Sequence, residues 1–114
     1  MTEPTDDLAT RAAAARERVR HASPADALAP GARTVVDVRQ PEEYAADHLD
    51  GAVNIPLDEL ADRAGELGDP GTPVVTYCNG GGRGSLGADT LGQLGWTDVV
   101  NLDGGIRGVR SQEG

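Results

Sequence analysis

The chain contains no lysine, no phenylalanine and only one cysteine among its 114 residues. One cysteine cannot form an intramolecular disulfide, and with only two histidines it cannot supply the ligands of a structural zinc site. We therefore expect a fold without disulfides, no metal or other cofactor, and a reduced thiol, as in the cytoplasm. The sequence also lacks an apolar segment of membrane-spanning length and an apolar signal-peptide core, so we expect no membrane association.

Positive charge is scarce as well. Ten arginines stand against 19 acidic residues, and the formal net charge is -9. Because proteins bind nucleic acids mainly by neutralising phosphates with Lys and Arg, this balance excludes nucleic acid as an expected partner. The acidic residues are spread along the chain, which indicates a solvated surface, so an anionic substrate depends on local positive potential.

Apolar spacing and helix caps divide the chain into alternating short helices and strands. The spacing predicts helices over residues 8–19, 24–28, 41–47, 57–67 and 85–94, and strands over 35–38, 52–55, 74–77 and 99–102. Thr5, Asp6 and Asp7 are cap candidates for the first helix, and Ser23 for the second. Strands alternating with helices favour an α/β fold with a parallel sheet covered on both faces. We expect an N-terminal accessory helix within residues 1–18 and one main domain over residues 19–114.

Cys78 stands where the apolar run 74–77 ends and the glycine-rich segment 79–84 begins. A free cysteine is most often a buried apolar side chain, and this is the alternative interpretation. Here the sulfur follows a central strand, at the edge of a parallel sheet where ligands bind. Backbone N–H groups and the positive end of the next helix favour the thiolate form there. The placement therefore indicates a nucleophile, with a fixed positive charge from Arg83.

Two other interpretations of the glycine-rich segment fit less well. Asn79-Gly80 is a hairpin signal, but the residues that follow lack strand alternation. Residues 82–87 match G-x-G-x-x-G, and Asp103 stands at a suitable distance for a ribose contact. However, Gly82 is separated from the strand end, and too few residues follow Asp103 to complete a dinucleotide-binding sheet. We expect no nucleotide cofactor.

The remaining interpretation is a cradle of backbone N–H groups around the sulfur of Cys78 and the anion that it attacks. In such a cradle we expect the glycines to adopt positive φ angles, at Gly80, Gly81, Gly82 and Gly84.

Four segments in this order resemble the motifs of the rhodanese-like sulfurtransferases. They are residues 37–44 (DVRQPEEY), 48–56 (HLDGAVNIP), Tyr77-Cys78 with Arg83, and 94–106, which ends in NLDGGI. The resemblance spans about residues 19–109. It implies a rhodanese-like α/β domain whose central, mainly parallel five-stranded sheet carries helices on both faces.

The resemblance also implies an activity and its residues. Cys78 is expected to take sulfane sulfur from a small anionic donor such as thiosulfate and to pass it, as a persulfide, to a thiol, protein or cyanide acceptor. Cys78 and Arg83 are the expected catalytic residues. The expected substrate-binding residues are Asn79, Gly80, Gly81, Gly82 and Arg83. The loop from Cys78 to Arg83 has the six-residue length that this family associates with sulfur transfer, whereas related phosphatases have one residue more.

A second function remains open, a non-catalytic or regulatory module that binds an anion or a partner through the same loop. Its support is the high glycine content of the loop and the lack of any basic residue expected near it besides Arg83. Arg83 itself either orients the donor or braces the loop through backbone carbonyls, and we favour the brace.

Other residues of the motifs have structural interpretations. We expect Asp37 and Arg39 to form a pair, with Glu43 near it, and His48 to position a loop by hydrogen bonds. Tyr44, Tyr77 and Trp96 are expected in the core. Gly84 replaces the serine common in the family, and Ser85 is expected to take over its hydrogen bond at the helix start.

Overall fold

The structure is a computed structural model that describes residues 7–113. The strands are β1 (Arg20–Ala22), β2 (Thr34–Asp37), β3 (Val53–Asn54), β4 (Val74–Tyr77) and β5 (Val99–Leu102). The helices are α1 (Leu8–Arg18), α2 (Pro24–Ala27), α3 (Pro41–Ala46), α4 (Leu60–Arg63), α5 (Gly82–Gln93) and α6 (Gly105–Glu113), with 3₁₀ turns η1 (Leu57–Glu59) and η2 (Ala64–Leu67) beside α4.

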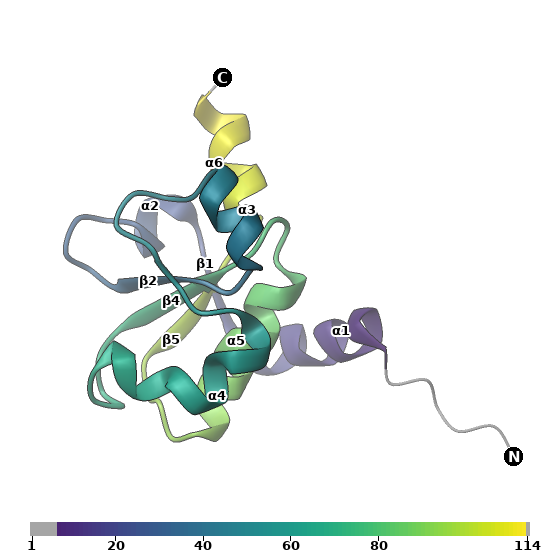
Figure 1. Cartoon of the computed structure of the whole chain (residues 1–114), viewed down its shortest axis with the longest axis vertical. Helices are drawn as coiled ribbons and strands as arrows, with labels where there is room; N and C mark the ends of the chain where they lie inside the picture. The colour runs from purple at the N-terminus through teal and green to yellow at the C-terminus, as the bar shows by residue number, and fades with distance from the viewer. Residues whose placement is uncertain (1–6, 114) are drawn as a thin grey trace, which may run out of the picture.

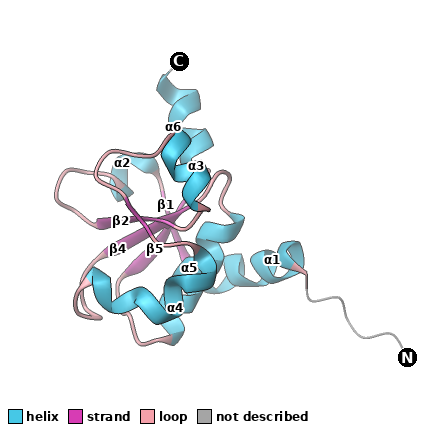
Figure 2. Ribbon diagram, viewed as in Figure 1, coloured by secondary structure: helices cyan, strands magenta, loops and turns pink. Residues whose placement is uncertain are grey.

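The five strands form one sheet in the order β1-β5-β4-β2-β3, and every neighbouring pair is parallel. The expected α/β fold is thus confirmed, with a fully parallel sheet where a mainly parallel one was expected. Helices lie on both sides of the sheet, with α4 and α5 on one side and α2, α3 and α6 on the other (Figures 1 and 2). β4 is the central strand, and its four residues are all buried. Its carboxyl end therefore lies in the middle of the sheet edge, between the ends of β5 and β2.

The two faces of the sheet carry separate apolar clusters. On the side of α4 and α5, Val36, Val38 and Val74 pack with Leu60 and Leu91. On the opposite side, the cluster contains Ala27, Leu49, Ala52, Val75, Tyr77, Val100, Leu102 and Ile106. Tyr77 and Trp96 are buried and Tyr44 is partly buried against the second cluster, which confirms their expected place in the core.

Most predicted helices and strands are present, with boundaries shifted by a few residues. Asp7 caps α1, because its Oδ1 accepts a hydrogen bond from the Thr10 amide at 2.8 Å, and Ser23 caps α2. The other two cap candidates, Thr5 and Asp6, lie outside the described residues. The helix expected over residues 57–67 is instead divided into η1, α4 and η2.

Sequence patterns missed two elements, β1 and α6. β1 is three residues long and carries no β-branched residue, so it lacks a strand signal of its own and is defined by its pairing with β5. α6 begins at Gly105 in a glycine-rich segment, and only Ile106 and Val109 give it an apolar face toward the second cluster. Both elements depend on tertiary contacts that the local sequence does not encode.

None of the helices described over residues 7–113 is long and apolar enough to cross a membrane.

Candidate active site

Cys78 directly follows β4 and is 3% exposed. Its Sγ accepts a hydrogen bond from the backbone amide of Gly81 at 3.1 Å, across the turn that leads into α5. α5 begins at Gly82, three residues earlier than predicted, so the sulfur lies beside the N-terminal turn of a 12-residue helix. The amides of that turn have no acceptor within the helix and carry its positive dipole end. The sulfur is therefore placed where negative charge is stabilised.

The expectation of positive φ at four loop glycines is wrong for three of them. Gly81 has φ +124°, whereas Gly80, Gly82 and Gly84 do not have positive φ. For Gly82 and Gly84 the reason is the early helix start, since both already belong to α5. One reversed residue is enough to turn the Gly81 amide toward the sulfur.

The start of α6 holds the loop from behind. The amide of Ile106 donates to the Cys78 carbonyl at 2.9 Å, and the amide of Arg107 donates to the Asn79 carbonyl at 3.0 Å. A Cβ at Gly105 would overlap these same two carbonyl groups. This support was missed from sequence, although the pair Gly104-Gly105 was the available signal.

Arg83 forms a two-pronged ion pair with Glu43 of α3. Its two terminal nitrogens lie 2.7 and 3.0 Å from the two carboxylate oxygens. The expected hydrogen bonds from Arg83 to backbone carbonyls are not found among the described residues, because the guanidinium faces Glu43 instead. The hydrogen bonds with Arg83 lower the pKa of Glu43 to about 2, although the partial burial of Glu43 opposes the shift. Glu43 is therefore ionised at neutral pH, and its charge offsets that of Arg83.

Asn79 links this ion pair to a second, buried one. Its Nδ2 donates to Glu43 Oε2 at 3.0 Å, and its Oδ1 accepts from Arg39 at 3.1 Å. Arg39 pairs with the fully buried Asp37 at 2.7 Å, which confirms the expected structural pair. Both ends of the Asn79 side chain are thus occupied, and the network fixes the loop to α3 and to the end of β2.

The other buried partner of Asp37 is Tyr77. The Tyr77 hydroxyl donates to Asp37 Oδ2 at 2.8 Å and accepts from the Leu49 amide at 3.0 Å. Burial, together with the neighbouring carboxylate, raises the pKa of Tyr77 well above its usual range. Tyr77 therefore stays neutral and acts as a structural link.

His48 and Ser85 take the positioning roles expected of them. His48 Nδ1 lies 2.9 Å from the Tyr44 carbonyl, and its ring stacks on Tyr44 with centroids 3.8 Å apart. Ser85 Oγ donates to the Gly81 carbonyl at 2.7 Å and so ties the first turn of α5 to the loop.

A cavity of about 280 Å³ opens beside the sulfur. Its residues from the loop and α5 are Cys78, Gly80, Gly82 and Arg83. Three further residues come from α1 and were not expected from sequence, namely Leu8, Ala9 and Ala12. Of the six predicted site residues, the structure thus brings four to one cavity. Asn79 and Gly81 do not line it: the side chain of Asn79 joins the ion-pair network, and the amide of Gly81 donates to Cys78 Sγ.

Arg83 is not the only basic residue near the loop, so that expectation is wrong. A Cβ built on Gly81 would lie 3.3 Å from a guanidinium nitrogen of Arg16, and one on Gly80 would lie 3.9 Å from Arg107. Both arginines are distant in sequence and reach the loop through α1 and α6. The tertiary structure therefore adds local positive potential that the loop sequence does not show.

Residues 21–112 match the family model of the rhodanese-like domain. The chain belongs to the rhodanese-like family.

Relatives of this rhodanese-like chain support a rhodanese-type sulfurtransferase. The thiosulfate sulfurtransferase PspE of Escherichia coli is 39% identical over 75 residues, which are 65% of this chain and 71% of PspE. The human single-domain sulfurtransferase TSTD1 has a TM-score of 0.70 at 30% identity and covers 76% of this chain and 88% of its own. In three other bacterial relatives, the region that matches this chain makes up only 22% to 57% of the relative's own length.

Similarity of fold extends over the whole rhodanese-like chain. A protein of unknown function from Rhodopseudomonas palustris, RPA3614, described as a possible tyrosine phosphatase, covers 100% of this chain and 96% of its own with a TM-score of 0.80. At 24% identity this likeness concerns the fold alone.

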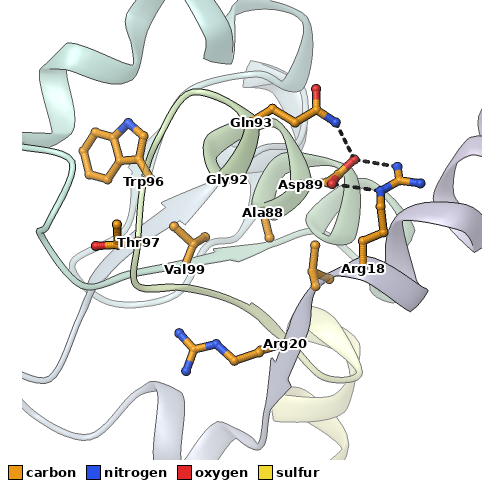
Figure 3. A pocket seen from close by; sticks show the side chains of 10 residues that line it. Arg18, Arg20, Ala88, Asp89, Gly92, Gln93, Trp96, Thr97 and Val99 are labelled. Carbon is orange, nitrogen blue, oxygen red and sulfur yellow. Dashed lines mark hydrogen bonds and ion pairs between the residues drawn. The ribbon is translucent and has the colours of Figure 1, made fainter.

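A second hollow of the rhodanese-like domain, about 370 Å³, lies at the amino ends of β1 and β5, whereas Cys78 follows the carboxyl end of β4 (Figure 3). Its two arginines are both ion-paired, Arg18 with Asp89 and Arg20 with Asp98. Within residues 7–113, no cluster of His, Cys, Asp or Glu is arranged to hold a metal. Of these two hollows, the cavity at Cys78 is the one that combines a nucleophile with the amides of a helix N-terminus.

Proposed function

We propose that this protein is a sulfurtransferase that carries sulfane sulfur on Cys78, with thiosulfate as one donor. The observation that supports this proposal most directly is the placement of Sγ, which accepts the Gly81 amide at the start of α5 and borders a cavity. A thiolate here is accessible to a small donor through the cavity and is otherwise enclosed.

The proposed reaction has two steps. In the first, the Cys78 thiolate attacks the outer sulfur of thiosulfate, the sulfur–sulfur bond of the donor breaks, and sulfite leaves with the electron pair. In the second, an acceptor thiolate or cyanide attacks the outer sulfur of the persulfide and regenerates the Cys78 thiolate. Atoms and charges balance without an added oxidant.

The proposed role of the loop is to stabilise the anionic sulfur through both steps. The Gly81 amide contacts Sγ, and the amides of Gly82 and Arg83 belong to the first turn of α5, where no helical carbonyl accepts from them. Amides fixed in this way stabilise developing charge in the manner of an oxyanion hole.

We assign Arg83 to bracing the loop more than to binding the donor. Its guanidinium is committed to Glu43 by two hydrogen bonds, and that pair continues through Asn79 to Arg39. The length of the loop also supports sulfur transfer, since the loop from Cys78 to Arg83 is one residue shorter than in the related phosphatases. A reducing, cytoplasmic setting remains part of the proposal because the only cysteine must stay a thiol.

The test is an intact-mass measurement after incubation with thiosulfate and removal of the excess. We expect a gain of one sulfur atom, about 32 Da, that a reductant reverses and that Cys78→Ser does not show. No gain with thiosulfate or with a low-molecular-weight persulfide would favour the alternative, a rhodanese-like module that binds an anion or a partner without turnover.

A further inference from the structure

The N-terminal helix α1 lies against α5 and beside the loop from Cys78 to Arg83, called the sulfur loop below (Figure 1). Ala12 and Ala15 are buried with Leu86 of α5, and Arg18 forms two hydrogen bonds with Asp89 at 3.1 and 2.6 Å. The helix is therefore fixed on the domain at its middle and at its C-terminal end.

This attachment places the first turns of α1 over the cavity at Cys78. Leu8, Ala9 and Ala12 form the wall that faces the loop, and all three side chains are apolar. Ala12 and Gly82 approach closely, since a Cβ on Gly82 would lie 3.4 Å from that of Ala12. Small residues on both sides keep the cavity open, and Leu8 at its rim remains 49% exposed.

The apolar surface continues beyond the cavity. A neighbouring hollow of about 400 Å³ shares Leu8 and Arg83 with it. Leu57 and Leu86 add apolar surface there, beside the polar residues Arg11, Gln40, Asp58 and Thr90. A donor whose sulfur reaches Cys78 therefore has room to extend an apolar group over this surface.

Charge at the cavity gives an inorganic anion little advantage. Arg83 is the only charged residue that lines the cavity among the described residues, and its charge is offset by the ionised Glu43 at 2.7 Å. The chain as a whole carries a net charge of -9. The cavity wall thus offers a dianion no uncompensated positive charge, although Arg16 and Arg107 reach the loop from outside the wall. An organic donor adds apolar contacts with α1.

We propose that α1 is a specificity element of the sulfur site, and that the preferred donor is an organic thiosulfonate whose apolar substituent lies against Leu8, Ala9 and Ala12. This inference rests on the proposed function and adds the substrate class. The Cys78 thiolate bonds to the outer sulfur of R–SO2–S⁻, the donor's sulfur–sulfur bond breaks, and its electron pair leaves on the sulfinate R–SO2⁻. The outer sulfur remains on Cys78 as the persulfide anion.

The test compares two donors with the same reacting group, benzenethiosulfonate and methanethiosulfonate, in the full-length protein. We expect the ratio of their kcat/KM values, benzene over methane, to fall roughly five- to tenfold in Leu8→Ser, because that change removes apolar contact with the larger substituent. The change in the ratio cancels the intrinsic difference in reactivity between the donors.

Leu94→Ser is the matched control. Leu94 is 47% exposed, close to the value for Leu8, but it follows the far end of α5, about 18 Å along the helix from the loop. We expect its donor ratio to equal that of the unchanged protein. Melting temperatures of both variants show whether the substitutions disturb folding.

Three results overturn the inference. A ratio that is unchanged in Leu8→Ser, or that falls equally in Leu94→Ser, overturns the role of α1 while the proposed function stands, provided that the Cys78 persulfide still forms with thiosulfate. Absence of the persulfide with all three donors overturns both proposals.

Discussion

At Gly84, one missing methyl group decides how closely α5 approaches the sheet. A Cβ there would collide with Asn101 Oδ1 and would lie 3.2 Å from the Tyr77 Cα. Asn101 is fully buried, and its Oδ1 has no hydrogen-bond partner among the described residues. The departure from the family's serine thus has a local cause, because Asn101 occupies the space that a serine side chain requires.

We therefore expect Gly84→Ala to lower the free energy of unfolding by about 2–3 kcal/mol, because the buried Asn101 must move and the backbone of Tyr77 cannot yield. Gly92→Ala is the control in the same helix, since no atom lies within 4 Å of its added Cβ. That variant should gain roughly 0.5–1 kcal/mol from helix propensity and reduced chain entropy. Urea unfolding of both proteins measures the difference. Equal effects of the two substitutions would contradict the close approach at Gly84.

At the scale of elements, three helices surround the sulfur loop from different directions. α3 contributes Glu43 to the ion pair with Arg83, α6 donates two amides to the carbonyls of Cys78 and Asn79, and α1 forms the apolar wall. The division into an accessory helix within residues 1–18 and a domain over 19–114 remains a proposal. If the role of α1 holds, the accessory helix belongs to the site in function.

The ion pair between Glu43 of α3 and Arg83 of α5 makes the stability of the fold depend on pH. The pKa of Glu43 falls from 4.5 to about 2 on folding, so its contribution is complete above pH 4.5 and is lost as the pH falls through about 2. We expect Glu43→Gln to lower the free energy of unfolding by about 1–2 kcal/mol at neutral pH, a value that allows for partial exposure of the pair. The difference in stability between Glu43→Gln and the unchanged protein should vanish as the pH approaches about 2.

Urea unfolding at a series of pH values tests this expectation, with Glu42→Gln as the control. Glu42 lies next to Glu43 on α3 but is exposed and is not part of the loop network. A difference between Glu43→Gln and the unchanged protein that stays constant with pH would show that the carboxylate charge does not stabilise the fold.

At the scale of the whole molecule, net charge opposes the local field of the site. The chain carries -9, while Arg16 and Arg107 reach the loop from α1 and α6. Repulsion between the net charge and an anionic donor acts over long range and is screened by salt.

We accordingly expect kcat/KM for thiosulfate to rise roughly two- to threefold as ionic strength increases from about 0.02 M to about 0.5 M. A neutral thiol reagent that labels Cys78 provides the control, since its rate should not show this rise. A kcat/KM that falls with salt would mean that the local arginines govern donor entry.

Local sequence signals suffice for the order of the main elements and for the position of the nucleophile candidate. Alternating apolar runs and caps are local signals, so β2, β4, β5, α1 and α2 were predictable. Cys78 was placed correctly at the end of the central strand, because an apolar run followed by glycines marks a strand end wherever the chain folds.

The surroundings of the sulfur, in contrast, come from contacts between distant segments. The sequence predicts backbone carbonyls as the partners of Arg83, whereas in the structure its partner is Glu43, 40 residues away in sequence. The wall from Leu8, Ala9 and Ala12 and the support from Ile106 and Arg107 likewise join distant segments. Such contacts form because parallel strands bring their carboxyl ends to one edge of the sheet, and helices packed on its two faces then meet there. No local pattern in the chain specifies which of these side chains become neighbours.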